Sequence, residues 1–339
     1  MSVGSSDPFA NGGACAQSGR VSYVFGPIAS RRLGRSLGVD PIVYKACNWN
    51  CVYCQLGRTT PLRHERQDFV PADDVVAEVI QALAEHAPGS IDWITFGGSG
   101  EPTLHASLGR MLRGVKAATE IPVAVLTNGA LLYRPEVQAE LMVADAVLPS
   151  LDAGSEELFQ RINRPWPELT FGRLIDGLVA FRRVFGGKLW VEVMLIKGVN
   201  DAEPELRDIA AVLERIRPHE VHINRPVRPP TEGWVQPPDE EALARAARIL
   251  GSNARVVAAT AACLELSPRG DVGSAIVEIL ARHPMSLEEL VQALERWGAG
   301  DVGQALASLA RDGRVRSVTR LGREFWSGVE AKYGEPPAP

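Results

Sequence analysis

Between residue 37 and about residue 260 the chain alternates short β-branched runs with longer amphipathic stretches, which restricts its fold more than any other feature. Such alternation produces βαβ units, whose right-handed crossovers make consecutive strands parallel. The runs are apolar on both faces, as expected for a parallel sheet that is covered on both sides. The predicted strands are 37–43, 91–96, 121–127, 145–151, 189–196 and 220–224.

The stretches between these runs have the pattern of surface helices. Residues 71–86, for example, place their aliphatic side chains on one helix face, which favours packing of that face on a core. The other helical patterns cover 106–119, 134–143, 170–185 and 203–216. We therefore predict an α/β fold, a partial (β/α)6 barrel of the TIM type, over residues 21–265.

Each predicted strand is followed by a polar or glycine-rich loop. In strand order the loops contain CNWNCVYC, GGSGEPT, TNG, SLDAG, KGVND and NRPVRPP. Gly, Asn and Pro mark turns, which explains any one of these loops but not all six on one rim. Because the loops at the carboxyl ends of parallel strands build the active sites of such folds, we expect the functional site there.

The first loop carries three cysteines, Cys47, Cys51 and Cys54. A structural zinc site usually has four ligands in two separated pairs, but Cys15 and Cys263 stand alone and no histidine lies close in the sequence. A thioredoxin-like CxxC site would leave Cys47 without a role. An iron–sulfur cluster is usually held by four thiolates, so three would leave one iron open to a substrate or cofactor.

The segment CNWNCVYC (47–54) resembles the CxxxCxφC signature of the radical S-adenosylmethionine (SAM) superfamily, in which φ is aromatic, here Tyr53. The resemblance implies that Cys47, Cys51 and Cys54 hold a [4Fe-4S] cluster. It further implies that the amino and carboxylate groups of SAM chelate the open iron. One electron, from an external donor of the flavodoxin or ferredoxin type, then cleaves the sulfonium to give a 5′-deoxyadenosyl radical that abstracts hydrogen.

Other loops resemble the SAM-contacting motifs of that superfamily. GGSGEPTL (97–104) resembles the GGE motif, with Ser99 where its first glycine usually stands. Taken alone, the polar residues at strand ends are more often turn or cap residues. Glu192 has two open interpretations, a SAM contact or an ion pair with a nearby arginine. The residues implied to bind the cofactor are Tyr53, Gly98, Gly100, Glu101, Thr127, Asn128, Ser150, Asp152 and Glu192.

A narrower resemblance covers residues 22–260. FGPIASRRLGRSLGVDPI, QLGRTT, SLDAG…INRP and KGVND resemble the branch that includes the wybutosine-type tRNA synthetases. They resemble more closely a group of shorter, uncharacterised bacterial and archaeal relatives with a C-terminal winged helix. The tRNA enzymes carry further cysteines for a second cluster. Only Cys15 and Cys263 are spare here, so we do not expect that activity.

The rim loops are rich in arginine although the chain has a net charge of −5. Guanidinium groups bind carboxylate and phosphate bidentately, so we predict an anionic small molecule, peptide or RNA as substrate. The alternative is that these arginines pair with Asp or Glu, or bind the SAM carboxylate. The predicted substrate-binding residues are Arg31, Arg32, Arg58, Arg164, Asn224, Arg225 and Arg228. No catalytic residue can be assigned.

After residue 270 the pattern changes to three short helices and a β-hairpin, typical of a winged helix over 270–330. Ser286 and Glu289 form a capping box at the second helix. Residues 271–339 have a net charge of −2, and the third helix lacks the polar and cationic face of a major-groove reader. We therefore predict a protein- or substrate-docking role for this domain and do not expect DNA binding.

The two terminal segments, the apolar runs and the cysteine count indicate disorder at the ends and the compartment of the protein. Residues 1–20 are small and polar, which predicts a disordered segment, and we expect a flexible tail over 331–339. No run approaches the roughly 18 apolar residues of a membrane span. Five cysteines, an odd number and mostly clustered, do not form a secreted disulfide framework. We expect a cytoplasmic protein.

Two classes of function are compatible with these patterns. The first is a radical SAM enzyme that modifies an anionic substrate, with RNA base modification as a variant. The second is a winged-helix regulator whose cluster or zinc senses metal or redox state. The SAM-type loops after the second, third and fourth strands have no role in a sensor, which favours the enzyme.

Overall fold

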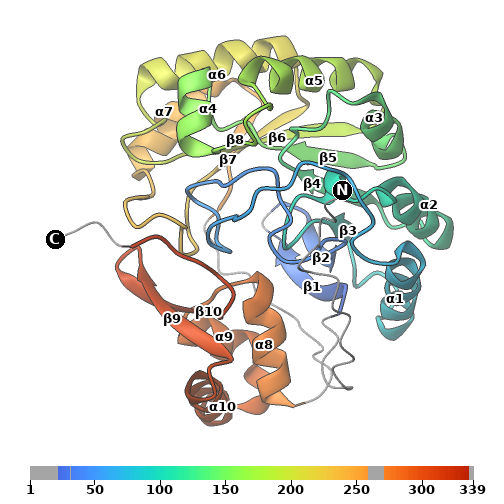
Figure 1. Cartoon of the computed structure of the whole chain (residues 1–339), viewed down its shortest axis with the longest axis vertical. Coiled ribbons are helices and arrows are strands. Elements are labelled where there is room, and N and C mark those ends of the chain that lie inside the picture. Colours follow the sequence, from blue (N-terminus) through green and yellow to red (C-terminus); the bar gives the residue numbers. More distant parts are fainter. Residues whose placement is uncertain (1–21, 31, 259–270, 336–339) are drawn as a thin grey trace, which may run out of the picture.

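The computed structural model describes residues 22–30, 32–258 and 271–335 (Figure 1). Its main sheet has eight strands paired in sequence order. The first strand is antiparallel to the second, and all the others are parallel to their neighbours. The strands are β1 (Val24–Ser30), β2 (Gly34–Val39), β3 (Trp93–Phe96), β4 (Val123–Thr127), β5 (Ala146–Pro149), β6 (Lys188–Met194), β7 (Glu220–Asn224) and β8 (Ala254–Val256).

The six predicted strands are confirmed as β2 to β7, but the count of six is wrong because β1 and β8 extend the sheet at its two edges. Strand β1 contains Gly26 and Pro27, and its register with β2 shifts between Phe25 and Ile28. Strand β8 is only three residues long and mostly exposed. Neither therefore presents the regular apolar run on which the prediction depended.

Helices cover one face of this sheet and meet it in a large apolar core. Val79, Met111 and Ile209 of the helices and Ile94 and Val125 of the strands are fully buried in it. Burying one such side chain contributes roughly 1.5–3 kcal/mol. The helices are α1 (Ala72–Glu85), α2 (Leu108–Ala118), α3 (Pro135–Leu141), α4 (Glu156–Ile162), α5 (Phe171–Val184), α6 (Glu203–Ile216) and α7 (Glu240–Leu250), with a 3-10 turn, η1 (Pro102–Leu104).

Two of these helices, α4 and α7, were not predicted from periodicity. Each begins at a side-chain cap: Ser155 accepts a hydrogen bond from the backbone N–H of Leu158, and Asp239 accepts one from Ala242. Such caps replace bonds that the first helical turn lacks. The cap residues are visible in the sequence, and α4 and α7 are as long as α3 and α2, which were predicted, so attention to the caps would have found them.

The inner face of the sheet, opposite these helices, carries a separate small cluster. Ala124, Ala146, Leu148, Trp190 and Leu33 pack together there. Because strand side chains alternate between faces, Ala124 lies inside while its neighbours in β4 belong to the helix-facing core. This cluster fills the inner space near the amino ends of β4 to β6, so polar side chains nearer the carboxyl ends face the rim.

Residues Asp271–Glu335 form what we call the C-terminal module. Its elements are α8 (Val272–Arg282), α9 (Leu287–Ala293), η2 (Glu295–Trp297), α10 (Ala299–Arg311), β9 (Val315–Arg320) and β10 (Arg323–Gly328). Three helices and a hairpin are thus confirmed, as is the Ser286–Glu289 capping box. Ile276, Leu290 and Leu306 belong to a core distinct from that of the sheet.

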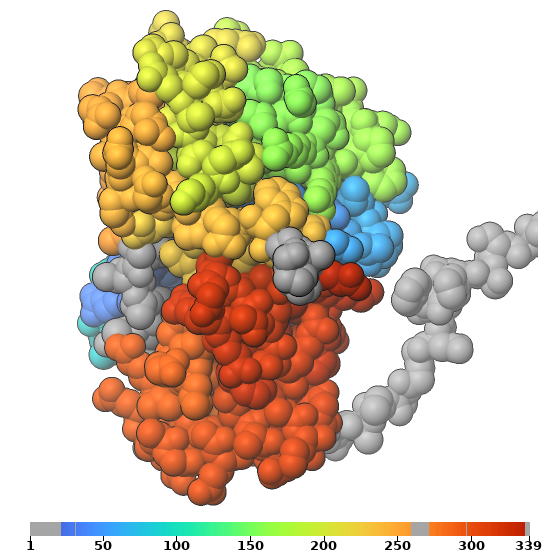
Figure 2. All heavy atoms as spheres, turned by 90° about the vertical axis from the view of Figure 1, so that its left-hand side faces the viewer, coloured from blue at the N-terminus to red at the C-terminus, as the bar shows by residue number. Residues whose placement is uncertain are grey.

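The module packs against the body of the molecule, where Figure 2 shows its red and orange surface directly beneath the yellow surface of the body. Residues 331–335, part of the expected flexible tail, differ from that expectation. The backbone N–H of Arg58 donates to the Lys332 carbonyl at 2.6 Å, and that of Gly334 donates to the Thr231 carbonyl at 2.8 Å. The Tyr333 hydroxyl donates to the Gln55 carbonyl at 2.7 Å. We call residues 331–335 the strap.

Several predictions fall outside the described residues: the N-terminal segment 1–20, Arg31, Cys15, Cys263 and the tail beyond residue 335. Among the residues that are described, no helix is long and apolar enough to cross a membrane.

Candidate functional site

The three cysteines lie on the loop that joins β2 to α1, at the carboxyl edge of the sheet. Trp49, between the first two, is 1% exposed and packs edge-on against Phe159 at 5.3 Å between ring centroids. Val52 is also fully buried. These apolar anchors fix the loop on the core, so the intervening thiols are held in place while remaining partly accessible.

Each of the three sulfurs has a nearby hydrogen-bond donor. The Trp49 backbone N–H donates to Cys47 Sγ at 3.4 Å, and Lys45 Nζ donates to Cys54 Sγ at 3.1 Å. Asn163 Nδ2 lies 3.8 Å from Cys51 Sγ. Donors around sulfur stabilise thiolates and tune the metal groups that thiolates bind.

Without a metal, the pKa values of Cys47 and Cys51 are raised, which favours the protonated thiol at both positions. Burial raises the pKa of Cys47 to about 12, with a further contribution from the Glu101 carboxylate. Burial and then the charges of Cys47 and Cys54 raise the pKa of Cys51 well above its ordinary value. Because metal ligation requires thiolates, binding at this loop is expected to release protons.

The donor set fits a [4Fe-4S] cluster better than a single ion. Within the described ranges, no three His, Cys, Asp or Glu side chains are grouped as the ligands of one metal ion would be. A [4Fe-4S] cluster would be held by thiolates, which Cys47, Cys51 and Cys54 supply. Next to the cysteines, Asn48 Nδ2 and Asn163 Oδ1 are buried without a hydrogen-bond partner, as expected where a polar group binds between them.

Glu101 joins the loop after β3 to the loop after β4. Its carboxylate is 2% exposed and accepts hydrogen bonds from the Thr127 hydroxyl and the Asn128 backbone N–H, both at 2.6 Å. Burial raises its pKa, although these hydrogen bonds oppose the shift. Asn128 Nδ2 in turn donates to Asn48 Oδ1 at 2.6 Å and lies 3.8 Å from Cys47 Sγ. The structure thus brings Glu101, Thr127 and Asn128 together beside Cys47.

Gly98 and Gly100 have a packing role that the motif resemblance did not indicate. A Cβ on Gly100 would lie 2.2 Å from the Ala46 carbonyl oxygen, and one on Gly98 would lie 2.6 Å from Asp40 Cγ. Only glycine permits this approach. The Glu101 backbone N–H also donates to the Ala46 carbonyl at 2.9 Å, so loop 97–101 is fitted directly against the segment that leads into Cys47.

Asp152 lies at the centre of a second group, next to Cys51. Its carboxylate accepts hydrogen bonds from the Tyr53 hydroxyl and Asn163 Nδ2, both at 2.6 Å, and from the Met194 backbone N–H at 2.8 Å. Burial raises the pKa of Asp152 to about 6. Tyr53 therefore contacts Asp152 in this structure, and the aromatic position of the signature helps to orient that carboxylate.

Glu192 forms an ion pair with Arg32, one of the two interpretations left open by the sequence. Both side chains lie on the inner side of the sheet, where Glu192 is in register with His222 and forms an isolated bridge with Ser150. His222 is fully buried and Asn224 is 4% exposed. His222 Nδ1 and Asn224 Oδ1 have no hydrogen-bond partner among the described residues.

The predicted rim arginines are mostly paired with carboxylates. Arg58 and Arg164 share Glu232, at 3.1 and 2.6 Å. Burial alone would raise the pKa of Glu232. The hydrogen bonds from these two guanidinium groups outweigh that effect and hold this pKa below its ordinary value. The Glu232 backbone N–H donates to the Val52 carbonyl at 3.0 Å, so this half-exposed group, with a net charge of +1, adjoins the cysteine loop.

Two predicted substrate residues are bound elsewhere. Arg225 pairs with Glu240, the first residue of α7, at 2.5 Å. Arg228 pairs with Glu289 of the C-terminal module at 2.6 Å and donates to the Pro284 carbonyl. Each guanidinium is thus engaged by a carboxylate outside the group around the cysteines. These contacts do not support the predicted role of Arg225 and Arg228 in substrate binding.

Comparison with known proteins gives the family. The family model described as the radical SAM superfamily matches residues 42–210. The UPF0026 protein MJ1312 of Methanocaldococcus jannaschii is 31% identical over 280 residues, which cover 81% of this chain and 87% of that protein. The chain belongs to the UPF0026 family of the radical SAM superfamily. It is therefore a radical SAM enzyme, and its cofactors are a [4Fe-4S] cluster and SAM.

Two further matches are more limited. The protein named GTPase Obg from Brachyspira hyodysenteriae is 35% identical over 300 residues, 88% of this chain, but the chain spans only 44% of that relative. This radical SAM chain has no GxxxxGK[ST] phosphate loop. The structure of Streptococcus suis SuiB with its precursor peptide SuiA matches with a TM-score of 0.50 and 15% identity, over 65% of this chain and 48% of that one. It supports the fold alone.

Sequence reasoning missed several residues of this radical SAM site: Lys45, Asn48, Asn163 and His222 contact or flank predicted residues. Lys45 lies two residues before the cysteine signature, Asn48 lies within it, and Asn163 lies in the INRP segment. Only their position beside a motif distinguished them, since Asn is common in turns. His222 had no sequence signal beyond its place in a predicted strand.

Proposed function

We propose that this protein cleaves SAM reductively at the Cys47–Cys51–Cys54 cluster and uses the resulting radical to modify an anionic substrate. When bound, the cluster supplies the single electron that breaks the sulfonium of SAM, leaving a 5′-deoxyadenosyl radical for hydrogen abstraction. The observation that carries this proposal is the convergence on one cysteine loop of two buried carboxylates, Glu101 and Asp152, each oriented by several donors.

The chain's own residues would orient SAM and adjust the reduction potential of the cluster. Loop 97–101 offers backbone groups for the SAM amino group. The Asp152 carboxylate is suited to accept a ribose hydroxyl, since short carboxylates at strand ends bind ribose in this way. The Lys45 ammonium, 3.1 Å from Cys54 Sγ, favours the reduced cluster because reduction adds negative charge beside it.

An anionic substrate is supported by the group of Arg58, Glu232 and Arg164. Two guanidinium groups share one carboxylate, so a positive charge remains, and the arginine side chains are 46% and 36% exposed. A substrate phosphate or carboxylate meeting them would form charge-assisted bonds. The unpartnered His222 Nδ1 and Asn224 Oδ1 favour a substrate that also carries hydrogen-bonding groups, because burying such atoms unpaired is costly.

A small molecule or peptide is favoured over RNA by the contacts of the C-terminal hairpin, within the domain that we propose to be a winged helix. Arg320 donates to the Gly334 carbonyl and Arg323 to the Val227 carbonyl. Arg316 lies over the Tyr333 ring at 5.5 Å. Arg323 thus contacts the body directly, and Arg316 and Arg320 contact the strap, which itself binds the body. These cations therefore support docking of the module on its own chain. The regulator alternative leaves Glu101 and Asp152 without a purpose.

The test is an anaerobic assay of the whole chain. The protein is reconstituted with iron and sulfide, reduced and given SAM, and products are separated by chromatography with mass detection. A variant with Cys47, Cys51 and Cys54→Ala is the control. We expect 5′-deoxyadenosine from the intact protein alone. A product bearing the aminocarboxypropyl fragment would contradict the adenosyl-radical step, and retention of zinc without SAM cleavage would overturn the enzyme proposal.

A further inference from the structure

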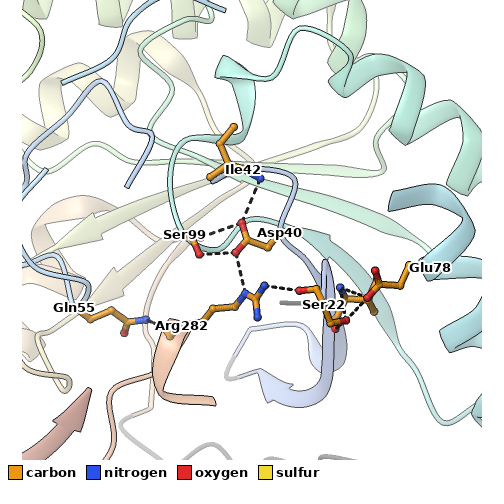
Figure 3. A network of polar contacts seen from close by, with 8 residues as sticks. Ser22, Asp40, Ile42, Gln55, Glu78, Ser99 and Arg282 are labelled. Carbon is orange, nitrogen blue, oxygen red and sulfur yellow. Dashed lines mark hydrogen bonds and ion pairs between the residues drawn. The ribbon is translucent and has the colours of Figure 1, made fainter. Parts of the chain in front are cut away.

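A buried network links the C-terminal module to the loops of the proposed SAM site (Figure 3). Asp40, which follows β2, is 3% exposed, and Arg282, the last residue of α8, is 5% exposed. Arg282 Nε donates to Asp40 Oδ2 at 2.9 Å. The same carboxylate accepts hydrogen bonds from the Ser99 hydroxyl at 2.5 Å and the Ser99 backbone N–H at 3.1 Å.

Ser99 stands in loop 97–101, where the related motif usually has glycine, so its hydroxyl adds a contact that glycine could not make. Gly98 packs against the same carboxylate, since a Cβ there would lie 2.6 to 2.9 Å from the Asp40 carboxyl atoms. The position of Asp40 therefore fixes the position of this loop. Asp40 is held in turn by the guanidinium of Arg282.

Arg282 also contacts the cysteine loop through its backbone. Gln55, the residue after Cys54, donates from Nε2 to the Arg282 carbonyl at 2.9 Å. The last carbonyls of a helix have no partner within the helix, and here a side chain of the cysteine loop supplies one. A single residue of the module thus contacts both loops: loop 97–101 through Asp40, and the cysteine loop through Gln55.

The surroundings of Arg282 make this arrangement rigid. Its Nη2 donates to the Ser22 carbonyl at 2.6 Å, and its guanidinium lies over the Phe25 ring at 5.0 Å. Removing one partner of a buried ion pair strongly destabilises a protein, because the other charge is left buried and unpaired. If Arg282 is lost, the Asp40 carboxylate must therefore move towards other donors, and loop 97–101 must adjust.

We propose that Arg282 is a positioning residue of the SAM site, through which the C-terminal module holds loop 97–101 and the cysteine loop in register for SAM. The inference rests on the proposed function, because it takes loop 97–101 as the SAM-binding loop. It makes the module part of the site and explains why the network crosses 242 residues of sequence.

The experiment compares Arg282→Met with Glu289→Gln in the reconstituted full chain. Glu289→Gln weakens another ion pair between module and body, Arg228–Glu289, while glutamine keeps the capping box. Iron and sulfide content are measured first. SAM affinity and the SAM-induced change in the electron paramagnetic resonance spectrum of the reduced cluster are then recorded. For Arg282→Met we expect a normal cluster content, at least tenfold weaker SAM binding and an altered spectrum; Glu289→Gln should bind SAM within twofold of wild type.

Wild-type SAM affinity in Arg282→Met, or equal losses in both variants, would overturn the inference. Ser99→Ala provides a second test if Arg282→Met fails to fold. It removes only the hydroxyl bond to Asp40 and should weaken SAM binding about threefold without loss of cluster; unchanged affinity contradicts the inference. A wild-type chain that binds no SAM would overturn the proposed function, and the inference with it, whereas normal binding in the variants overturns the inference alone.

Discussion

The carboxylates beside the cysteines and the polar side chains inside the sheet differ in how completely their hydrogen bonds are made. Both oxygens of Glu101 and both of Asp152 accept bonds from the chain. On the inner face, His222 Nδ1 and Asn224 Oδ1 are buried without partners. The first group is organised before any ligand arrives, as expected for SAM orientation, whereas the second group leaves polar atoms for a substrate to meet.

This contrast predicts opposite responses to mutation. Removing a donor next to Glu101 or Asp152 should lower both stability and SAM binding. Removing an unpartnered inner-face group should leave the fold intact and impair only the substrate-dependent reaction. Substitution of a cluster cysteine should have a larger effect than either, because every later step depends on the cluster.

The largest effect is expected for Cys51→Ser. A serine hydroxyl is a poor ligand for iron compared with thiolate, so bound iron should fall and 5′-deoxyadenosine formation should drop to background. Iron analysis and the anaerobic assay measure both. The matched control, Cys15→Ser with Cys263→Ser, should retain cluster and turnover; a comparable loss in that control would show that the spare cysteines also bind metal.

The pH dependence of stability tests the burial of Asp152. Burial raises its pKa from 3.8 to about 6 in the folded chain. The folded state therefore binds a proton more tightly than the unfolded state. The associated stability is present below pH 3.8 and is lost as the pH rises through 6. Asp152→Asn should flatten the change in the free energy of unfolding between pH 4 and 7, by up to about 3 kcal/mol.

Urea unfolding of the apoprotein at several pH values measures this change. Asp92→Asn is a suitable control, because hydrogen bonds from Arg35 lower the pKa of that exposed carboxyl and its effect should have the opposite sign, at more acidic pH. An unaltered pH slope in Asp152→Asn would contradict the prediction.

Thr127→Val tests the bonded group with little change in shape. It removes the hydroxyl that donates to Glu101 and accepts from the Gly129 backbone N–H. Leaving a buried acceptor without its donor costs about 1–3 kcal/mol, so the free energy of unfolding should fall by that amount and SAM affinity should weaken. Stability equal to wild type would mean that the Glu101 network is not fully formed in solution.

The smallest effect on stability is expected for Asn224→Leu. Because Asn224 Oδ1 has no hydrogen-bond partner among the described residues, replacing the amide with an apolar group of similar size should change the free energy of unfolding by less than about 0.5 kcal/mol. SAM cleavage in the absence of substrate should continue. A destabilisation as large as that of Thr127→Val would remove the distinction between the two groups.

The difference between the two groups also explains how far the sequence could be interpreted. The cysteine loop and the strand-end motifs are local signals, and the sequence placed Cys47, Glu101 and Asp152 on loops that follow predicted strands, where the structure also has them. The partners of the arginines are not local. Glu232 lies 174 residues from Arg58 and 68 from Arg164, and no spacing rule connects them, so the sequence left open whether these arginines bind a substrate or pair with acidic residues.

The fold shows the same difference between local sequence signals and contacts distant in sequence. Strands with an apolar run in a regular βα repeat were predicted, whereas β1 and β8 belong to the sheet only through pairing with a neighbour. Arg282 had no signal at all, since a single arginine at the end of a surface-type helix is ordinary until Asp40 is seen beside it.

The strap also places a constraint on when the site is assembled. Residues 331–335 are synthesised long after the cysteine loop, yet Lys332 and Tyr333 bind backbone groups of Arg58 and Gln55, close to Cys54. The cysteine loop is thus released from synthesis about 275 residues before its final neighbours. Until residue 331 has been synthesised, the cysteine loop lacks the hydrogen bonds to Lys332 and Tyr333.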